Sequence, residues 1–130
     1  MGSMKMAKQI LVIDDEELIT KSLVLALEKS GYEVLVAKRC DEATAMAEAV
    51  DFDLIISDIR MPGIDGIETV TRILDVMAKR SVPKIPTIFM TGYADQKAEA
   101  EAKTLNPKAY IIKPFDLIQF LDEVKKALGA

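Results

Sequence analysis

Short runs of apolar, often β-branched residues alternate with longer segments of helical period along the whole chain. This alternation is typical of an α/β fold, because a crossing helix brings two successive strands side by side and parallel. Such crossovers are right-handed, and helices then cover both faces of the sheet. The predicted strands are Gln9–Ile13, Glu33–Ala37, Leu54–Ser57, Thr87–Met90 and Ala109–Ile112. The predicted helices are Glu17–Ser30, Asp41–Ala49, Gly66–Lys79, Ala94–Thr104 and Leu117–Leu128, with Asp41 and Asp116 as candidate N-caps.

Polar residues stand where four of the predicted strands end. They are Asp14 and Asp15 after the first strand, Asp58 after the third, Thr91 after the fourth and Lys113 after the fifth. Parallel strands point in one direction, so their carboxyl ends open onto the same crevice. Three carboxylates, a hydroxyl and an amine gathered there are suited to holding a divalent cation and a phosphoryl group.

Length and composition narrow the class of protein further. A chain of 130 residues is expected to form one domain that buries roughly two thirds of its unfolded surface. Half of the residues are apolar and the net charge is −4, which favours a globular protein and argues against intrinsic nucleic-acid binding. The absence of histidine excludes Ser-His-Asp and Cys-His catalysis.

Nothing in the sequence predicts a membrane or secreted protein. The longest apolar run is Leu23–Leu27, far below the roughly 18 residues of a membrane span. A single cysteine, Cys40, excludes an internal disulfide and fits a cytoplasmic location. Residues 1–3 are typical of a vector remnant, so the domain is expected to comprise residues 4–130.

Four segments resemble the receiver domains of two-component response regulators, including those of the chemotaxis type. They are residues 10–16 (ILVIDDE), 58–66 (DIRMPGIDG), 90–93 (MTGY) and 113–115 (KPF), in this order and each at a predicted strand end. The resemblance extends over residues 8–128. It implies a flavodoxin-like, doubly wound sheet of five parallel strands in the order 2-1-3-4-5, in which the first and third strands are neighbours.

The predicted site needs cations. Two unit charges of like sign 4 Å apart repel by about 4 kcal/mol at an effective dielectric near 20. Mg²⁺ suits such a site because it prefers oxygen ligands and binds one or two carboxylates together with a phosphate. The resemblance implies that Mg²⁺, or Mn²⁺ in its place, is bound directly by Asp15, Asp58 and the backbone carbonyl of Arg60, and through water by Asp14.

The resemblance also assigns roles in phosphoryl transfer. Asp58 is the implied phosphoacceptor, with Lys113 and Thr91 contacting the phosphoryl oxygens and a cis peptide bond between Lys113 and Pro114. Thr91 and Tyr110 form the implied conformational switch. Arg60 and Tyr93 occupy the positions that tune the lifetime of the phosphorylated state, and their bulk predicts slow self-dephosphorylation.

Partners follow from the same resemblance. The phosphoryl donor is expected to be a phosphohistidine of a histidine kinase or a histidine phosphotransfer protein, docking near Leu18, Ile19 and Ser22 of the first helix. Residues 94–128 are expected to contact a downstream output protein or domain. The domain is expected to be a monomer or weak dimer that catalyses its own phosphorylation and no metabolic reaction.

Each motif alone has a simpler interpretation. Acidic residues such as Asp14 to Glu17 favour the start of a helix, and an aspartate before a Pro-Gly loop is usually a turn former. A lysine before a proline is usually solvated. The four motifs together favour the site.

Two other functions remain open. A small phosphatase of the haloacid-dehalogenase type also uses an aspartyl phosphate, but it is expected to carry Asp-x-Asp after its first strand, and here the two aspartates are adjacent. The second is an interaction module with the receiver fold that works without phosphorylation. Such proteins usually lack one of the acids or the lysine, all of which are present here.

Overall fold

The chain forms a single parallel sheet with helices on both faces. The computed structural model describes residues 7–92 and 95–129. The expected vector remnant at residues 1–3 and the side chain of Tyr93 lie outside these ranges. Within the described residues the strands are β1 (Gln9–Ile13), β2 (Glu33–Ala37), β3 (Leu54–Asp58), β4 (Thr87–Thr91) and β5 (Ala109–Ile112). The helices are α1 (Glu17–Lys29), α2 (Cys40–Ala49), α3 (Gly66–Lys79), α4 (Gln96–Lys103) and α5 (Leu117–Ala127).

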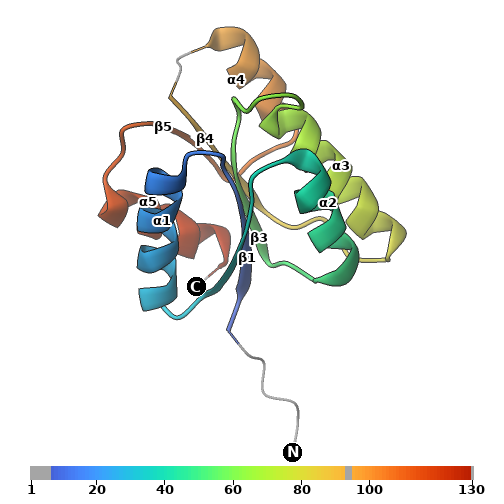
Figure 1. Ribbon diagram of the computed structural model, residues 1–130, viewed down its shortest axis with the longest axis horizontal. Coiled ribbons are helices and arrows are strands. Elements are labelled where there is room, and N and C mark those ends of the chain that lie inside the picture. The colour runs from blue at the N-terminus through green and yellow to red at the C-terminus, as the bar shows by residue number, and fades with distance from the viewer. Residues whose placement is uncertain (1–6, 93–94, 130) are drawn as a thin grey trace, which may run out of the picture.

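The strand order is β2-β1-β3-β4-β5, and every neighbouring pair is parallel (Figure 1). This confirms the flavodoxin-like order that the resemblance to receiver domains implies. The order reverses between β1 and β3, where Ile13 pairs with Ser57. The residues that follow these two positions, Asp14 and Asp58, are therefore adjacent at the carboxyl edge of the sheet.

Two apolar layers hold the helices to the sheet. Alternate residues of a strand face opposite sides, so Leu11 and Ile13 of β1 pack toward α2 and α3 while Ile10 and Val12 pack toward α1 and α5. β1 is buried on both sides, as expected of a central parallel strand. The two layers thus hold in place the strand ends at which Asp58 and Thr91 lie.

Most element boundaries agree with the sequence-based expectations. β3 and β4 each extend one residue further, to Asp58 and Thr91, because Asp58 still pairs with Met90 and Thr91 with Ile112. The N-cap expected at Asp116 is confirmed, since its side chain accepts a hydrogen bond from the amide of Ile118 at 2.7 Å.

The N-cap expected at Asp41 is wrong. Helix α2 begins one residue earlier, at Cys40, and its N-cap is Arg39, which makes no side-chain capping bond. Helix α4 begins at Gln96, later than expected, because Asp95 caps it by accepting from the amides of Lys97 and Ala98.

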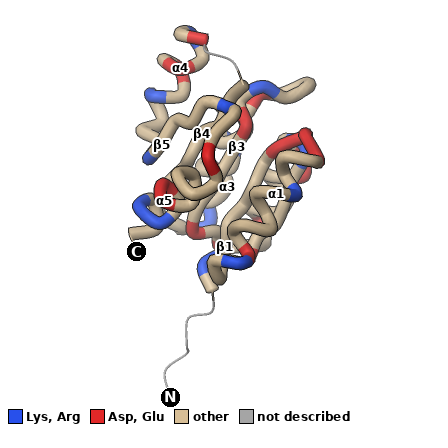
Figure 2. Tube along the Cα trace, turned by 90° about the vertical axis from the view of Figure 1, so that its left-hand side faces the viewer, with Lys and Arg blue, Asp and Glu red and all other residues tan. Residues whose placement is uncertain are grey.

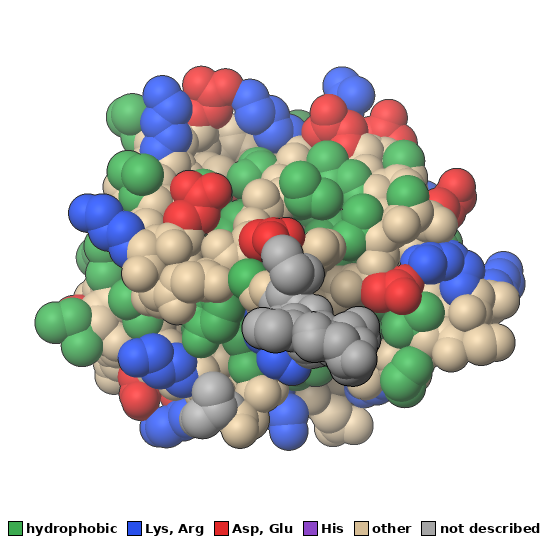
Figure 3. Space-filling view, turned by 90° about the horizontal axis from the view of Figure 1, so that it is seen from below, with side chains coloured by type: hydrophobic (Ala, Val, Ile, Leu, Met, Phe, Trp, Pro, Cys, Tyr) green, Lys and Arg blue, Asp and Glu red, His purple; other side chains and the backbone are tan. Residues whose placement is uncertain are grey.

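The two ends of the sheet differ in character. Acidic residues gather where α1 begins, at the carboxyl edge of the sheet (Figure 2). The opposite end, viewed from below, carries charged side chains of both signs scattered among apolar ones (Figure 3). No helix among the described residues is both long and apolar enough to cross a bilayer.

Candidate functional site

Asp14 is the most deeply buried acid of the site. Its side chain has no solvent exposure, and its Oδ1 accepts a hydrogen bond from the backbone amide of Glu16 at 3.0 Å. Its Oδ2 has no hydrogen-bond partner within the described part of the chain. Burial raises the pKa of Asp14 to about 6, although the Glu16 amide and the charge of Lys113 act in the opposite direction.

This raised pKa predicts that Asp14→Asn stabilises the metal-free protein. Since the folded-state pKa exceeds the unfolded one, the folded state binds more protons, and stability falls as the pH rises from about 4 through about 6. We expect Asp14→Asn to increase the free energy of unfolding by about 1–3 kcal/mol at pH 7.5 and to change it little at pH 4.

Urea unfolding at the two pH values, with a chelator present, measures this effect. Asp15→Asn is the matched control, because Asp15 is exposed and its substitution is expected to change stability by less than about 0.5 kcal/mol. An Asp14→Asn variant no more stable than the wild type at pH 7.5 would contradict the raised pKa assigned to this carboxylate.

Asp58 is the last residue of β3 and is 3% exposed. Its backbone carbonyl accepts a hydrogen bond from the Ser57 hydroxyl at 2.9 Å. Helix α3 starts directly behind it, where the amide of Gly66 donates to the carbonyl of Ile59 at 2.8 Å. A Cβ atom at Gly66 would lie 1.8 Å from the Asp58 carbonyl oxygen. Glycine at this position therefore allows the helix to support the strand end that carries Asp58.

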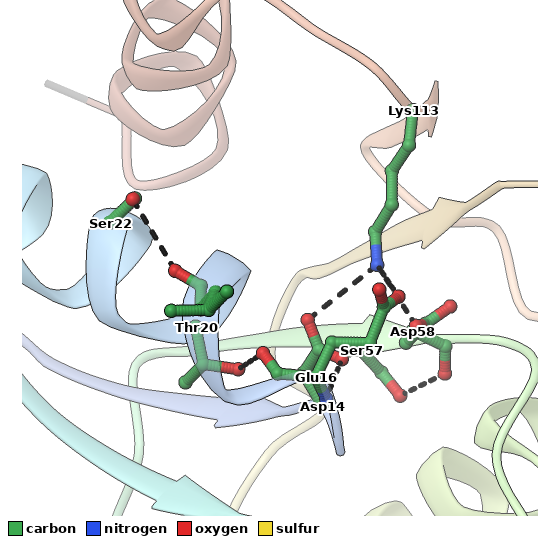
Figure 4. Close-up of polar contacts among 8 residues, drawn as sticks. Asp14, Glu16, Thr20, Ser22, Ser57, Asp58 and Lys113 are labelled. Atoms are coloured by element: carbon green, nitrogen blue, oxygen red, sulfur yellow. Dashed lines mark hydrogen bonds and ion pairs between the residues drawn. The ribbon is translucent and has the colours of Figure 1, made fainter.

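Lys113 connects the carboxylates of the site. Lys113 lies one residue beyond the end of β5. Its backbone amide donates to the carbonyl of Thr91 at 2.7 Å, and its peptide bond to Pro114 is cis. Its Nζ lies 3.0 Å from an oxygen of Asp58, 3.0 Å from one of Glu16 and 3.6 Å from one of Asp14 (Figure 4). Burial lowers the pKa of Lys113, but the hydrogen bonds to Glu16 and Asp58 and the nearby carboxylate charges outweigh it and raise the pKa.

The carboxylates of Asp14, Glu16 and Asp58 form one acidic group, with an oxygen of each within 4.8 Å of the others. Three acids face the one amine of Lys113, and the Oδ2 of Asp14 has no hydrogen-bond partner among the described residues. Hard oxygen ligands with excess negative charge fit a divalent cation such as Mg²⁺.

The residues of this group differ in part from those that the sequence indicated. Asp15 is exposed and lies toward Lys38 and Arg39 after β2, so among the described residues it is not part of the acidic group. Glu16 takes a place in the group that the sequence did not indicate. It is the N-cap residue of α1, and its side chain extends to Lys113.

Three further expected site residues, Thr91, Tyr110 and Arg60, belong to the described part of the chain. Thr91 ends β4 and is 2% exposed. Tyr110 stands opposite Phe89 of β4, so Tyr110 and Thr91 share one face of the sheet, and the tyrosine ring packs on the side of α3 and α4. Burial raises the pKa of Tyr110. The Arg60 guanidinium lies 3.5 Å from the carboxylate of Asp95.

The family of this chain is decided by comparison with known sequences. The response regulator receiver domain matches residues 10–125. The chain belongs to the response regulator receiver family. This receiver domain is 31% identical over 124 residues to the polar-differentiation response regulator DivK of Brucella ovis, covering 95% of this chain and 98% of that protein.

A second relative is longer than this receiver domain. The transcriptional regulatory protein ResD of Bacillus subtilis is 33% identical over 120 residues, which are 92% of this chain and 48% of ResD. The chain thus spans about half the length of that relative. Among solved structures, a CheY-like receiver domain protein of Methanospirillum hungatei superposes with a TM-score of 0.85 at 30% identity, covering 95% of this chain and 94% of the other.

Proposed function

We propose that this receiver domain accepts a phosphoryl group on Asp58. The observation that carries the proposal is the nearly buried Asp58 carboxylate, with the Lys113 amine 3.0 Å away at the carboxyl edge of the sheet. The carboxylate can act as nucleophile, and the amine can neutralise charge that develops on the phosphoryl oxygens.

In the proposed step an Asp58 oxygen attacks phosphorus in line with the leaving group. An O–P bond to Asp58 forms as the N–P bond of a phosphohistidine breaks, and the electron pair of the broken bond stays on the imidazole nitrogen. Lys113 contacts the transferred phosphoryl oxygens, and the Thr91 hydroxyl donates to them. The chain itself contributes positioning and charge neutralisation rather than a proton relay.

Mg²⁺ is the proposed cofactor, with Mn²⁺ as an alternative, and when bound it neutralises the carboxylates and the phosphoryl group. Asp15, Asp58 and the Arg60 carbonyl would hold it directly and Asp14 through water. Asp15 must turn inward for this role.

Calorimetric titration with Mg²⁺ tests the assignment, since Asp15→Ala is expected to weaken binding more than Asp14→Ala. Equal affinities for the two variants would count against it.

The same site accounts for switching and for signal lifetime. We assign Thr91 and Tyr110 to the switch because the phosphate would draw the Thr91 hydroxyl inward and alter the space beside the tyrosine on the same sheet face.

We assign Arg60 and Tyr93 to shielding the phosphoryl group from water. Replacing them with Asn and Glu should shorten the phosphoprotein half-life about tenfold, a barrier change of about 1.4 kcal/mol. Unchanged decay in the double variant would exclude shielding by these residues.

The donor is proposed to be a histidine kinase or a histidine phosphotransfer protein. An apolar groove runs beside the site between α1 and the segment after β5, lined by Leu18, Ile19, Phe115 and Leu117 together with Lys113. Leu18 and Leu117 are 82% and 40% exposed, so this apolar lining is open to a partner. A donor seated in this groove would bring its phosphohistidine to Asp58. The output partner is proposed to bind the face that carries α4, β5 and α5.

A turnover assay with acetyl phosphate separates this function from the alternatives. A receiver is expected to incorporate one phosphoryl group per chain and then to release phosphate only as slowly as the phosphoprotein decays. Sustained turnover on generic phosphate esters would favour the phosphatase. Absence of any labelling with both acetyl phosphate and phosphohistidine donors would favour an interaction module that works without phosphorylation.

A further inference from the structure

Glu16 and Asp58 both pair with the amine of Lys113. The Oε1 of Glu16 lies 3.0 Å from the Lys113 Nζ, the same distance as the Asp58 oxygen. The Lys113 side chain is only 10% exposed, whereas that of Glu16 is 54% exposed. The amine is therefore held in place, and the glutamate is the partner with room to move.

The backbone of Glu16 is fixed even though its side chain is not. Its amide donates to Asp14 Oδ1 at 3.0 Å, and its carbonyl accepts from both the amide and the hydroxyl of Thr20, at 3.0 Å and 2.8 Å. A rotation about the side-chain bonds would move the carboxylate into solvent without disturbing α1. Figure 4 shows Glu16 extending from the start of this helix toward Lys113.

A phosphoryl group on Asp58 would introduce further negative charge within a few ångströms of Glu16, since oxygens of the two acids lie within 4.8 Å of each other. Both anions would then share the single positive charge of Lys113, which cannot neutralise the two of them together. Release into water costs the half-exposed carboxylate of Glu16 the least free energy, whereas the buried carboxylate of Asp14 cannot move out of the site.

We propose that Glu16 is a displaceable counter-ion of Lys113. In the unphosphorylated domain it holds the amine over Asp58, and the incoming phosphoryl group must displace it. Glu16 thus positions Lys113 at rest and opposes phosphorylation. This inference rests on the proposed role of Asp58.

Glu16→Gln tests the inference because glutamine keeps the shape and an acceptor oxygen but removes the charge. Its neutral hydrogen bond to Lys113 is weaker and is displaced more easily. Beryllofluoride in saturating Mg²⁺ serves as the phosphoryl mimic, and calorimetry measures its affinity. We expect Glu16→Gln to bind it about three- to tenfold more tightly than the wild type, an effect limited by the exposure of the glutamate.

Glu17→Gln is the matched control. Glu17 is the adjacent residue, its side chain is 67% exposed, and it pairs with Lys38 instead of Lys113. The substitution changes the net charge by the same amount, so it reports any general effect of charge on anion binding. We expect its beryllofluoride affinity to equal that of the wild type. In the metal-free protein, the Lys113 ammonium resonance in NMR spectra should shift in Glu16→Gln and stay unchanged in Glu17→Gln.

The outcomes separate this inference from the proposed function. If the wild type binds no beryllofluoride and is not labelled at Asp58, the proposed function fails. If the wild type binds it but Glu16→Gln binds no more tightly than Glu17→Gln, the counter-ion role alone is overturned. A large loss of Mg²⁺ affinity in Glu16→Gln, without a gain for beryllofluoride, would overturn it in favour of a metal ligand.

Discussion

Replacing Gly66 with alanine is expected to destabilise the receiver domain by about 3 kcal/mol or more. The added Cβ would lie 1.8 Å from the carbonyl oxygen of Asp58, and 2.8 Å from both its carbonyl carbon and the Ser57 hydroxyl oxygen. Two of these three atoms belong to the backbone of a buried strand, so no side-chain rotation relieves the overlap. Helix α3 or the end of β3 must move.

The same shift should disturb the site, because the displaced strand end carries the Asp58 carboxylate. Urea unfolding measures the stability, and the rate of labelling by acetyl phosphate measures the site. Gly92→Ala is the matched control: Gly92 follows Thr91 at the same sheet edge, and a Cβ there would meet no atom of the described residues within 4 Å. Equal stabilities for Gly66→Ala and Gly92→Ala would contradict the close approach of α3 to β3.

Replacing Lys113 with alanine is expected to slow phosphorylation of Asp58 by about 100-fold or more. The amine is the positive side-chain group that lies 3.0 Å from the Asp58 carboxylate, so its removal takes away stabilisation of the transition state and of the product. Mg²⁺ binding should persist because the oxygen ligands remain. The loss should therefore appear in the rate at saturating metal rather than in the metal affinity.

Lys38→Ala is the control for this variant. Lys38 follows β2 at the same edge of the sheet but pairs with Glu17, and its side chain is 52% exposed. We expect its phosphorylation rate to stay within about twofold of the wild type, since exposed ion pairs contribute little. Circular dichroism establishes that both variants are folded. A Lys113→Ala variant labelled as fast as Lys38→Ala would exclude contact between this amine and the phosphoryl group.

The sheet and the location of the site were predictable from the sequence. Apolar runs of strand length are interrupted by helical segments, and in a parallel sheet such runs must end at one edge. The carboxyl edge of the sheet therefore brings together Asp14, Asp58, Thr91 and Lys113. A difference of one residue in where a strand ends does not change this. One-residue differences at β3 and β4 arise because ladder pairing continues into the polar residues.

Side-chain directions were less predictable. Asp14 and Asp15 are adjacent, but the first is buried and the second, in the bend between β1 and α1, is exposed. The direction of Glu16 depends on where α1 begins, and the acidic run alone does not specify it. The ion pair between Arg60 and Asp95 joins residues 35 positions apart, so it could be identified only from the tertiary structure.

Intact-mass spectrometry tests the central claim most directly. The wild type, Asp58→Asn and Asp51→Asn are incubated with acetyl phosphate and Mg²⁺ at neutral pH. Asp51 is an exposed aspartate that pairs with Arg80 and serves as the control. We predict that the wild type and Asp51→Asn each gain the mass of one phosphoryl group, that a chelator abolishes the gain, and that Asp58→Asn gains nothing. An Asp58→Asn variant labelled as fully as the wild type would contradict the assignment of Asp58 as the phosphoacceptor.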